Sequence, residues 1–93
     1  MNSEKNERGK RLSQLLEEIQ GIGPLMRGSV TMMGKRHKQP YFSVSVKGKT
    51  KVIYLGSNRA KKAKKYTDNY RRLMELVEEM TLLNMERLKQ ENP

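Results

Sequence analysis

The middle of the chain carries the clearest alternation of apolar and polar residues. In the stretch FSVSVK, which begins at Phe42, apolar side chains alternate with serines and a lysine. This is the two-residue period of a half-buried β-strand. Gly48 supplies a turn, and the stretch TKVIYL returns with the composition of a second strand. The pattern predicts an antiparallel hairpin over residues 41–55, with Lys47 and Gly48 as its turn.

The length of this turn determines which residues share a face of the hairpin. A two-residue turn, which we expect, places the apolar residues of both strands on one face: Phe42, Val44, Val46, Ile53 and Leu55. A loop of odd length would turn Val52 and Tyr54 inward instead. With the two-residue turn, the opposite face carries Tyr41, Ser43, Ser45, Val52 and Tyr54.

A helical period precedes the hairpin. The stretch RLSQLLEEIQ has apolar residues at the i, i+3, i+4 and i+7 positions of one helix face: Leu12, Leu15, Leu16 and Ile19. Gly21 is expected to end this helix, because Gly23-Pro24 makes continuation unfavourable. The next stretch, MRGSVTMM, predicts a first strand, and GKRHKQP predicts a polar, basic connection.

A second helical period follows the hairpin. Gly56-Ser57-Asn58 offers an N-cap, and no helix breaker follows until about Gln90. One apolar stripe runs along this helix at about 100° per residue: Ala63, Tyr66, Tyr70, Leu73, Val77, Met80 and Leu88. Several leucines fall outside the stripe and lack obvious cover. We therefore expect residues 73–88 to form a dimer interface that includes Leu76, Met80, Leu82 and Leu83.

These elements predict one small α+β domain over residues 1–93. It consists of a short N-terminal helix, a three-stranded antiparallel sheet and a long C-terminal helix, with residues 1–8 and 90–93 frayed. A hairpin with an irregular first strand is the alternative for the sheet. Only 34% of the residues are hydrophobic, with one Phe and no Trp. Such a small core often depends on a partner subunit or a ligand.

The net charge of +10 is concentrated in one segment. Residues 27–72 contain fourteen cations and one acid, which gives +13, whereas residues 1–26 are neutral and residues 73–93 carry −3. No acid lies between Glu18 and Asp68. Such a concentration of one sign is typical of a protein that binds a polyanion.

The densest basic stretch, NRAKKAKKY at residues 58–66, opens the expected C-terminal helix. Four lysines share a helix face roughly 160° wide: Lys61, Lys62, Lys64 and Lys65. The small alanines on the other side let the helix lie close to the sheet. Together with Arg59 at the helix N-terminus, where anions are attracted, these lysines are candidates for holding phosphates. The alternative is a solvated run of charge.

A second basic surface is expected on the hairpin and on the connection before it. Its candidate residues are Arg36, Lys38, Lys47, Lys49 and Lys51. A sheet can enter a major groove, where its serines and lysines meet bases and phosphates. Lysine also protects exposed sheet edges, and both interpretations can hold together. Tyr41 and Tyr54 could stack on unpaired bases, although a tyrosine in such a position is more often a core or rim residue.

Catalysis is not expected. The chain has no Cys, and His37 is its only histidine, which is too little for a metal site or a catalytic triad. Gly48-Lys49-Thr50 lacks the eight-residue pattern and the strand–loop–helix setting of a phosphate-binding loop. No acidic cluster occurs in the basic segment for a two-metal site. We expect neither a metal nor a cofactor.

A membrane partner is not expected either. No apolar run approaches the roughly 20 residues of a membrane span, and no long apolar signal region follows the N-terminus. A cytoplasmic location follows by default. Binding to an anionic membrane surface would need bulky apolar residues beside the lysines, where Ala60 and Ala63 are too small.

Three stretches resemble a family of small uncharacterised prokaryotic proteins associated with mobile elements: GPLMRGSV, PYFSVSVKGKTKVIYL and NYRRLMELVEEMTLLNMERL. The resemblance covers most of residues 12–88 and implies a helix, a short strand, a cysteine-rich loop, a hairpin and a long helix. This chain has MMGKRHKQP where the family has clustered cysteines, so no metal knuckle carries over. At the level of fold, the hairpin and following helix also resemble the modules that precede tyrosine recombinases and bind DNA arm sites.

The sequence thus favours a non-catalytic nucleic-acid-binding protein whose expected partner is double-stranded DNA. RNA is the close alternative, because contacts to phosphates do not distinguish the two. A protein-interaction module is the alternative of a different class, for example a helical dimer or adaptor in a phage or transposon nucleoprotein assembly. Its support is the wide apolar surface after Leu73.

Overall fold

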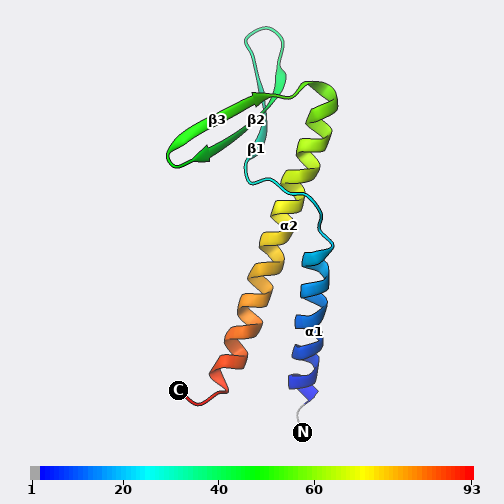
Figure 1. The fold of residues 1–93 in the computed structure, drawn as a ribbon, viewed down its shortest axis with the longest axis vertical. Helices are drawn as coiled ribbons and strands as arrows, with labels where there is room; N and C mark the ends of the chain where they lie inside the picture. The colour runs from blue at the N-terminus through cyan, green and yellow to red at the C-terminus, as the bar shows by residue number, and fades with distance from the viewer. Residues whose placement is uncertain (1–2) are drawn as a thin grey trace. The chain divides into compact units, whose positions relative to one another are not determined.

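The computed structural model describes residues 3–93, and the side chains of the first helix from residue 6 onward. Its elements are α1 (Ser3–Gln20), β1 (Ser29–Met33), β2 (Gln39–Val46), β3 (Lys49–Tyr54) and α2 (Gly56–Lys89) (Figure 1). The expected α+β class and order of elements are confirmed, with β1 as a regular strand. The segment up to residue 8, predicted to be frayed, is helical from Ser3 onward, and its fraying stays a prediction. Residues 1–2 of that segment lie outside the described residues.

The chain forms two compact units. The sheet unit comprises Pro24–Arg71, with all three strands and the first half of α2. The helix-pair unit comprises the chain up to Gly23 together with Arg72–Pro93. One long helix therefore contributes to both units, and each unit buries its own set of apolar side chains.

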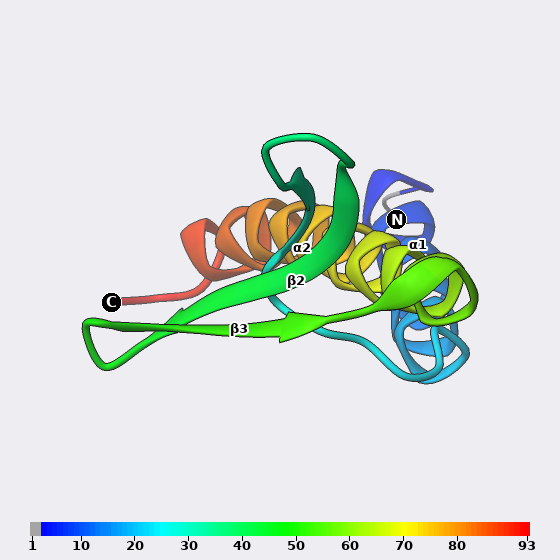
Figure 2. The same cartoon turned by 90° about the horizontal axis from the view of Figure 1, so that it is seen from above.

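The three strands form one antiparallel sheet in the order β1-β2-β3 (Figure 2). Phe42 on the central strand lies opposite Val30 on β1 and Ile53 on β3. The turn between β2 and β3 has φ values of 52° at Lys47 and 78° at Gly48. Two positive values are required by a type I′ turn, whose twist matches that of the flanking strands. The expected two-residue turn is confirmed, and with it the assignment of side chains to the two faces.

The core of the sheet unit lies between the central strand and the first turns of α2. Phe42, Leu55 and Ala63 are buried there. The partly buried residues packed against them are Met26, Val30, Val44 and Ala60. The alanine side of α2 thus lies against the sheet, as the sequence predicts. Ile53 shares this face of the sheet but remains 54% exposed, because the core does not extend beneath β3, all of whose residues are exposed.

Gly28 makes room for Phe42 in this core. Its φ is 141°, and a Cβ atom at this position would lie 2.6 Å from the Phe42 ring and 2.6 Å from the carbonyl oxygen of Ser43. Any larger residue would have to displace either the ring or the backbone of β2. The glycine is therefore a packing requirement of the sheet unit.

In the helix-pair unit, α1 and the second half of α2 lie side by side and run in opposite directions (Figure 1). Leu12 and Leu15 on α1 and Leu76 on α2 are its buried residues. Leu16 was expected on the same buried face of α1 but is 52% exposed. The buried face of α1 is therefore narrower than predicted. The helix ends as predicted, since the Gly21 N–H donates to the carbonyl oxygens of Glu17 and Glu18 at 3.1 and 3.2 Å.

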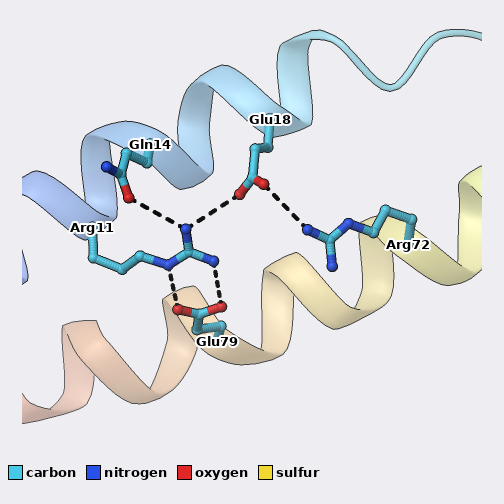
Figure 3. Close-up of polar contacts among 5 residues, drawn as sticks. All are labelled: Arg11, Gln14, Glu18, Arg72 and Glu79. Carbon is cyan, nitrogen blue, oxygen red and sulfur yellow. Dashed lines mark hydrogen bonds and ion pairs between the residues drawn. The ribbon is translucent and has the colours of Figure 1, made fainter.

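Ion pairs connect these two helices (Figure 3). Arg11 holds both carboxylate oxygens of Glu79, with Nε and Nη2 donating at 2.5 and 2.8 Å. Its Nη1 lies 3.5 Å from Glu18, whose other oxygen accepts from Arg72 at 3.2 Å. The hydrogen bond from Arg11 holds the pKa of the Glu79 carboxyl below its ordinary value of 4.5. The bidentate geometry fixes the relative height of the two helices.

The prediction for the apolar stripe of α2 needs correction. Leu76, predicted to lack cover, is only 1% exposed, whereas Val77 and Leu88, predicted on the buried stripe, are exposed. The reason is that each unit buries a different side of the helix. The buried positions Ala63 and Leu76 lie roughly 140° apart around the helix axis, so no single stripe describes all of α2.

Candidate nucleic-acid interface

The ten cations predicted to bind nucleic acid all belong to the sheet unit, and all ten residues are exposed. They are Arg36, Lys38, Lys47, Lys49, Lys51, Arg59, Lys61, Lys62, Lys64 and Lys65. Among the side chains of residues 6–93, none of them forms an ion pair. The only acid of the sheet unit, Asp68, pairs with Arg71 at 3.3 Å. The basic charge of this unit is therefore not neutralised from within the described chain.

Four of these cations project from α2 around a buried alanine. Lys61, Lys62, Lys64 and Lys65 are exposed, while Ala63 is 4% exposed against the sheet. The Nζ of Lys62 lies 6.0 Å from the centroid of the Tyr66 ring, at the limit of a cation–π contact. This face of α2 therefore presents lysine ammonium groups to solvent, as the helical spacing of the lysines predicts.

Arg59 has a structural contact that the sequence did not suggest. Its Nε donates to the carbonyl oxygen of Leu55 at 2.9 Å, across the junction of β3 and α2. This bond orients the guanidinium group and satisfies a carbonyl that precedes the helix. The other N–H groups of Arg59 remain available to an anion, so its role as a phosphate ligand remains a prediction.

The hairpin cations divide between the turn and one face of the sheet. Lys47 occupies the turn, whereas Lys49 and Lys51 lie opposite Val46 and Val44. Cross-strand partners share a face, so these two lysines lie on the face that packs on α2. The serines of β2 lie on the other face, opposite Thr50 and Val52. Lys49 and Lys51 therefore lie on the opposite face of the sheet from the serines. Of the three hairpin lysines, only Lys47 in the turn could meet the same DNA groove as the serines.

The face of the sheet turned away from α2 carries no charged side chain. Its residues are Ser29, Thr31, Met33, Gln39, Tyr41, Ser43, Ser45, Thr50, Val52 and Tyr54. The rings of Tyr41 and Tyr54 meet edge to face with centroids 5.4 Å apart, and the Tyr54 hydroxyl donates to Gln39 Oε1 at 3.3 Å. The tyrosines thus pack on each other, which is a structural use of both rings. Hydroxyl groups dominate the rest of this face.

Three further exposed cations belong to this unit and were not predicted as ligands: Arg27, Lys35 and Arg71, the last of which pairs with Asp68. Arg27 precedes β1, and its Nη2 donates to the carbonyl oxygen of Ser45 at 2.8 Å. Lys35 lies in the loop between β1 and β2, next to Arg36. Their positive charge was visible in the sequence, but only the pairing of β1 with β2 brings Arg27 to the far end of β2.

His37 lies exposed in the same loop. Among residues 3–93, no three His, Cys, Asp or Glu side chains gather as a metal site would require. In that same part of the chain, no helix is both long and apolar enough to cross a bilayer.

No protein-family model, curated protein or solved structure matches this chain. The resemblance to the mobile-element family stays a prediction.

Proposed function

We propose that this protein binds nucleic acid without catalysing a reaction, and that its partner is double-stranded DNA. The supporting observation is that the ten cations of the interface have no ion-pair partner among the described side chains of residues 6–93. The sheet unit contains thirteen cations and one acid, a net charge of +12 over residues 24–71. A phosphate backbone that reached this unit would relieve the repulsion among its lysines and release counterions.

The lysine face of α2 is the best candidate for holding phosphates. Lys62 and Lys65 are exposed on either side of Ala63, which is buried against the sheet. Neither ammonium group forms an ion pair with a described carboxylate, so no ion pair would have to break when it binds a phosphate. Contacts of this kind position a protein on the duplex without reading its sequence.

The uncharged face of the sheet favours duplex DNA over duplex RNA. The axes of the two outer strands of a three-stranded sheet lie about 10 Å apart, and the major groove of B-form DNA is about 12 Å wide. The major groove of A-form RNA is too narrow for such an insertion. The hydroxyls of Ser43 and Ser45 would then face base edges, with the cations of the loops at either end of the strands near the phosphates.

Self-association is a second proposal, and it rests on a separate observation. Met74, Val77, Met85 and Leu88 are exposed and fall within roughly 80° of arc on α2. This apolar stripe replaces the interface expected from the sequence, because Leu76 is buried and Met80 and Leu83 are partly buried in the helix-pair unit. Of the four residues named for that interface, Leu82 alone is largely exposed, at 56%. An exposed apolar stripe of this kind suits a second copy or a partner helix.

A salt titration tests the nucleic-acid proposal. With about six phosphates neutralised, log affinity for duplex DNA should fall with log salt at a slope of roughly −5. Structured RNA and anionic vesicles serve as competing probes. In a variant with Lys62→Gln and Lys65→Gln, log affinity should fall less steeply with log salt. The matched control, Lys10→Gln with Lys89→Gln, removes the same charge from the helix-pair unit and should keep the wild-type slope. Absence of binding at low salt, or an affinity independent of salt, contradicts the proposal.

A further inference from the structure

A groove runs between β1 and the first half of α2, and the proposed function leaves it unassigned. It consists of two adjoining hollows of about 420 and 350 Å³, both lined by Val30 and Lys64. The first has an apolar floor that includes Met32 and Ala60. The second continues along the helix to Arg71. Together they form a path beside the strand, lined by the cations Lys61, Lys64 and Arg71 and by one acid, Asp68, which pairs with Arg71 at 3.3 Å.

The strand beside this groove is an open edge of the sheet. In the order β1-β2-β3, β1 pairs only with β2. No other element of the described chain donates to, or accepts from, the outer backbone groups of Ser29–Met33. These groups are therefore free to pair with an added strand.

The two edges of the sheet are protected very differently. The β3 edge carries Lys49 and Lys51, and charged side chains of this kind discourage pairing with a further strand. The β1 sequence SVTMM has no charge and no proline, and its Met32 and Met33 are exposed. An unprotected edge next to a groove is the arrangement that accepts an extended peptide as an additional strand.

Charge identifies the kind of peptide. Lys61 and Lys64 stand on the rim of the groove, and Arg71 lies at its far end. A second copy of the same edge would bring another sheet unit of +12 against this one, which opposes pairing between identical edges. We propose that the groove binds an extended acidic segment of a partner protein, which pairs with β1 as a fourth strand.

The occupant can be described further from the size of β1. Five residues of strand span about 17 Å, so five or six residues of peptide would pair. Alternate side chains of the added strand would point into the groove, because successive side chains alternate between faces. Apolar side chains there would cover Val30 and Met32, and carboxylates would reach Lys61 and Lys64.

The helix offers a matched pair of variants to test this site. Lys61→Glu with Lys64→Glu reverses two charges on the rim, whereas Lys62→Glu with Lys65→Glu reverses two charges that do not line the groove. All four residues are exposed, and circular dichroism checks that both variants keep their helix content. The probe is a labelled eight-residue peptide that alternates Glu with Val, titrated into the full chain and followed by fluorescence anisotropy.

We expect the rim variant to weaken peptide binding roughly tenfold or more, and the matched variant to weaken it less than about threefold. A peptide with proline at two adjacent central positions should not bind, because in either register one of the two prolines would take a position whose N–H must pair with β1. Equal losses in the two variants, or equal binding of the proline peptide, would mean charge attraction without a site and would overturn the proposal.

Amide hydrogen exchange provides a second readout that charge attraction would not change. Adding the peptide should slow the exchange of outward-facing amides within residues 29–33. If duplex DNA protects these amides and the peptide does not, the groove belongs to nucleic acid. If they are already protected in a dimer of the free chain, a second copy occupies the edge. Either result overturns the peptide assignment.

Discussion

The two basic surfaces of the sheet unit can be separated by a pair of triple variants. One replaces the helix lysines Lys61, Lys62 and Lys65 with Gln, and the other replaces the hairpin lysines Lys47, Lys49 and Lys51. All six residues are exposed, and none forms an ion pair among the described residues. Each variant removes three charges without breaking an ion pair among the described residues. A general field effect would weaken DNA binding equally in both, whereas specific docking would not.

The expected magnitude follows from the number of contacts removed. Each phosphate contact contributes about 0.9 to the salt slope, so three lost contacts lower its magnitude by about 2.7. At 0.15 M salt this corresponds to a loss of affinity on the order of a hundredfold, relative to 1 M salt where the electrostatic contribution vanishes. The same loss should appear for every duplex sequence, because phosphates carry no base information.

Fluorescence anisotropy with two labelled duplexes of different sequence, measured at several salt concentrations, separates the possible outcomes. We expect the helix variant to lose affinity uniformly. If the sheet enters a groove, the hairpin variant should also lose its preference between the duplexes. Wild-type affinity of the helix variant at 0.15 M salt, with an unchanged circular dichroism spectrum, would refute the reasoning. The stretch NRAKKAKKY would then be a solvated helix face.

Three further outcomes test the fold and the proposed contacts. Leu76→Ala should lower the free energy of unfolding by about 2–5 kcal/mol, and Leu82→Ala by about 0.5 kcal/mol or less, in urea unfolding; similar losses would contradict the burial of Leu76. Because the hydrogen bond from Arg11 lowers the pKa of Glu79, its contribution to stability is complete above the ordinary glutamate range and lost as pH falls through the lowered value. Glu79→Gln should therefore weaken the loss of stability in acid, and unfolding curves below pH 5 that match wild type would count against this. Met85→Lys should reduce self-association in sedimentation, which a monomeric wild type at high micromolar concentration would contradict.

Local patterns were sufficient for the elements of the sheet. The alternation after Phe42 and the residues Lys47-Gly48 determined both the strand and its turn, because a two-residue turn with positive φ at both positions suits few other sequences. The basic character of the interface was likewise visible, since charge does not depend on folding. The exposure of the lysines around Ala63 followed from helical geometry alone.

The packing contacts of the helices could not be predicted from such local patterns. A stripe calculated along α2 assumes one neighbour, but Ala63 is buried against the sheet and Leu76 in the helix pair. Each unit selects its own side of the helix, which is why Leu76 was assigned to an intermolecular interface. Burial depends on which segments meet, and the spacing of leucines within one helix does not contain that information.

The candidate surfaces likewise combine features that are visible in the sequence with features that depend on the tertiary structure. Which residues are cationic, and which alternate along a strand, is a property of neighbouring positions in the chain. The separation of Lys49 and Lys51 from the serines, the uncharged face and the open β1 edge all depend on strand register and order. Register is determined when distant segments pair and bury one face. The groove beside Val30 and Lys64 therefore exists only in the folded sheet unit, where residues more than thirty positions apart line the same space.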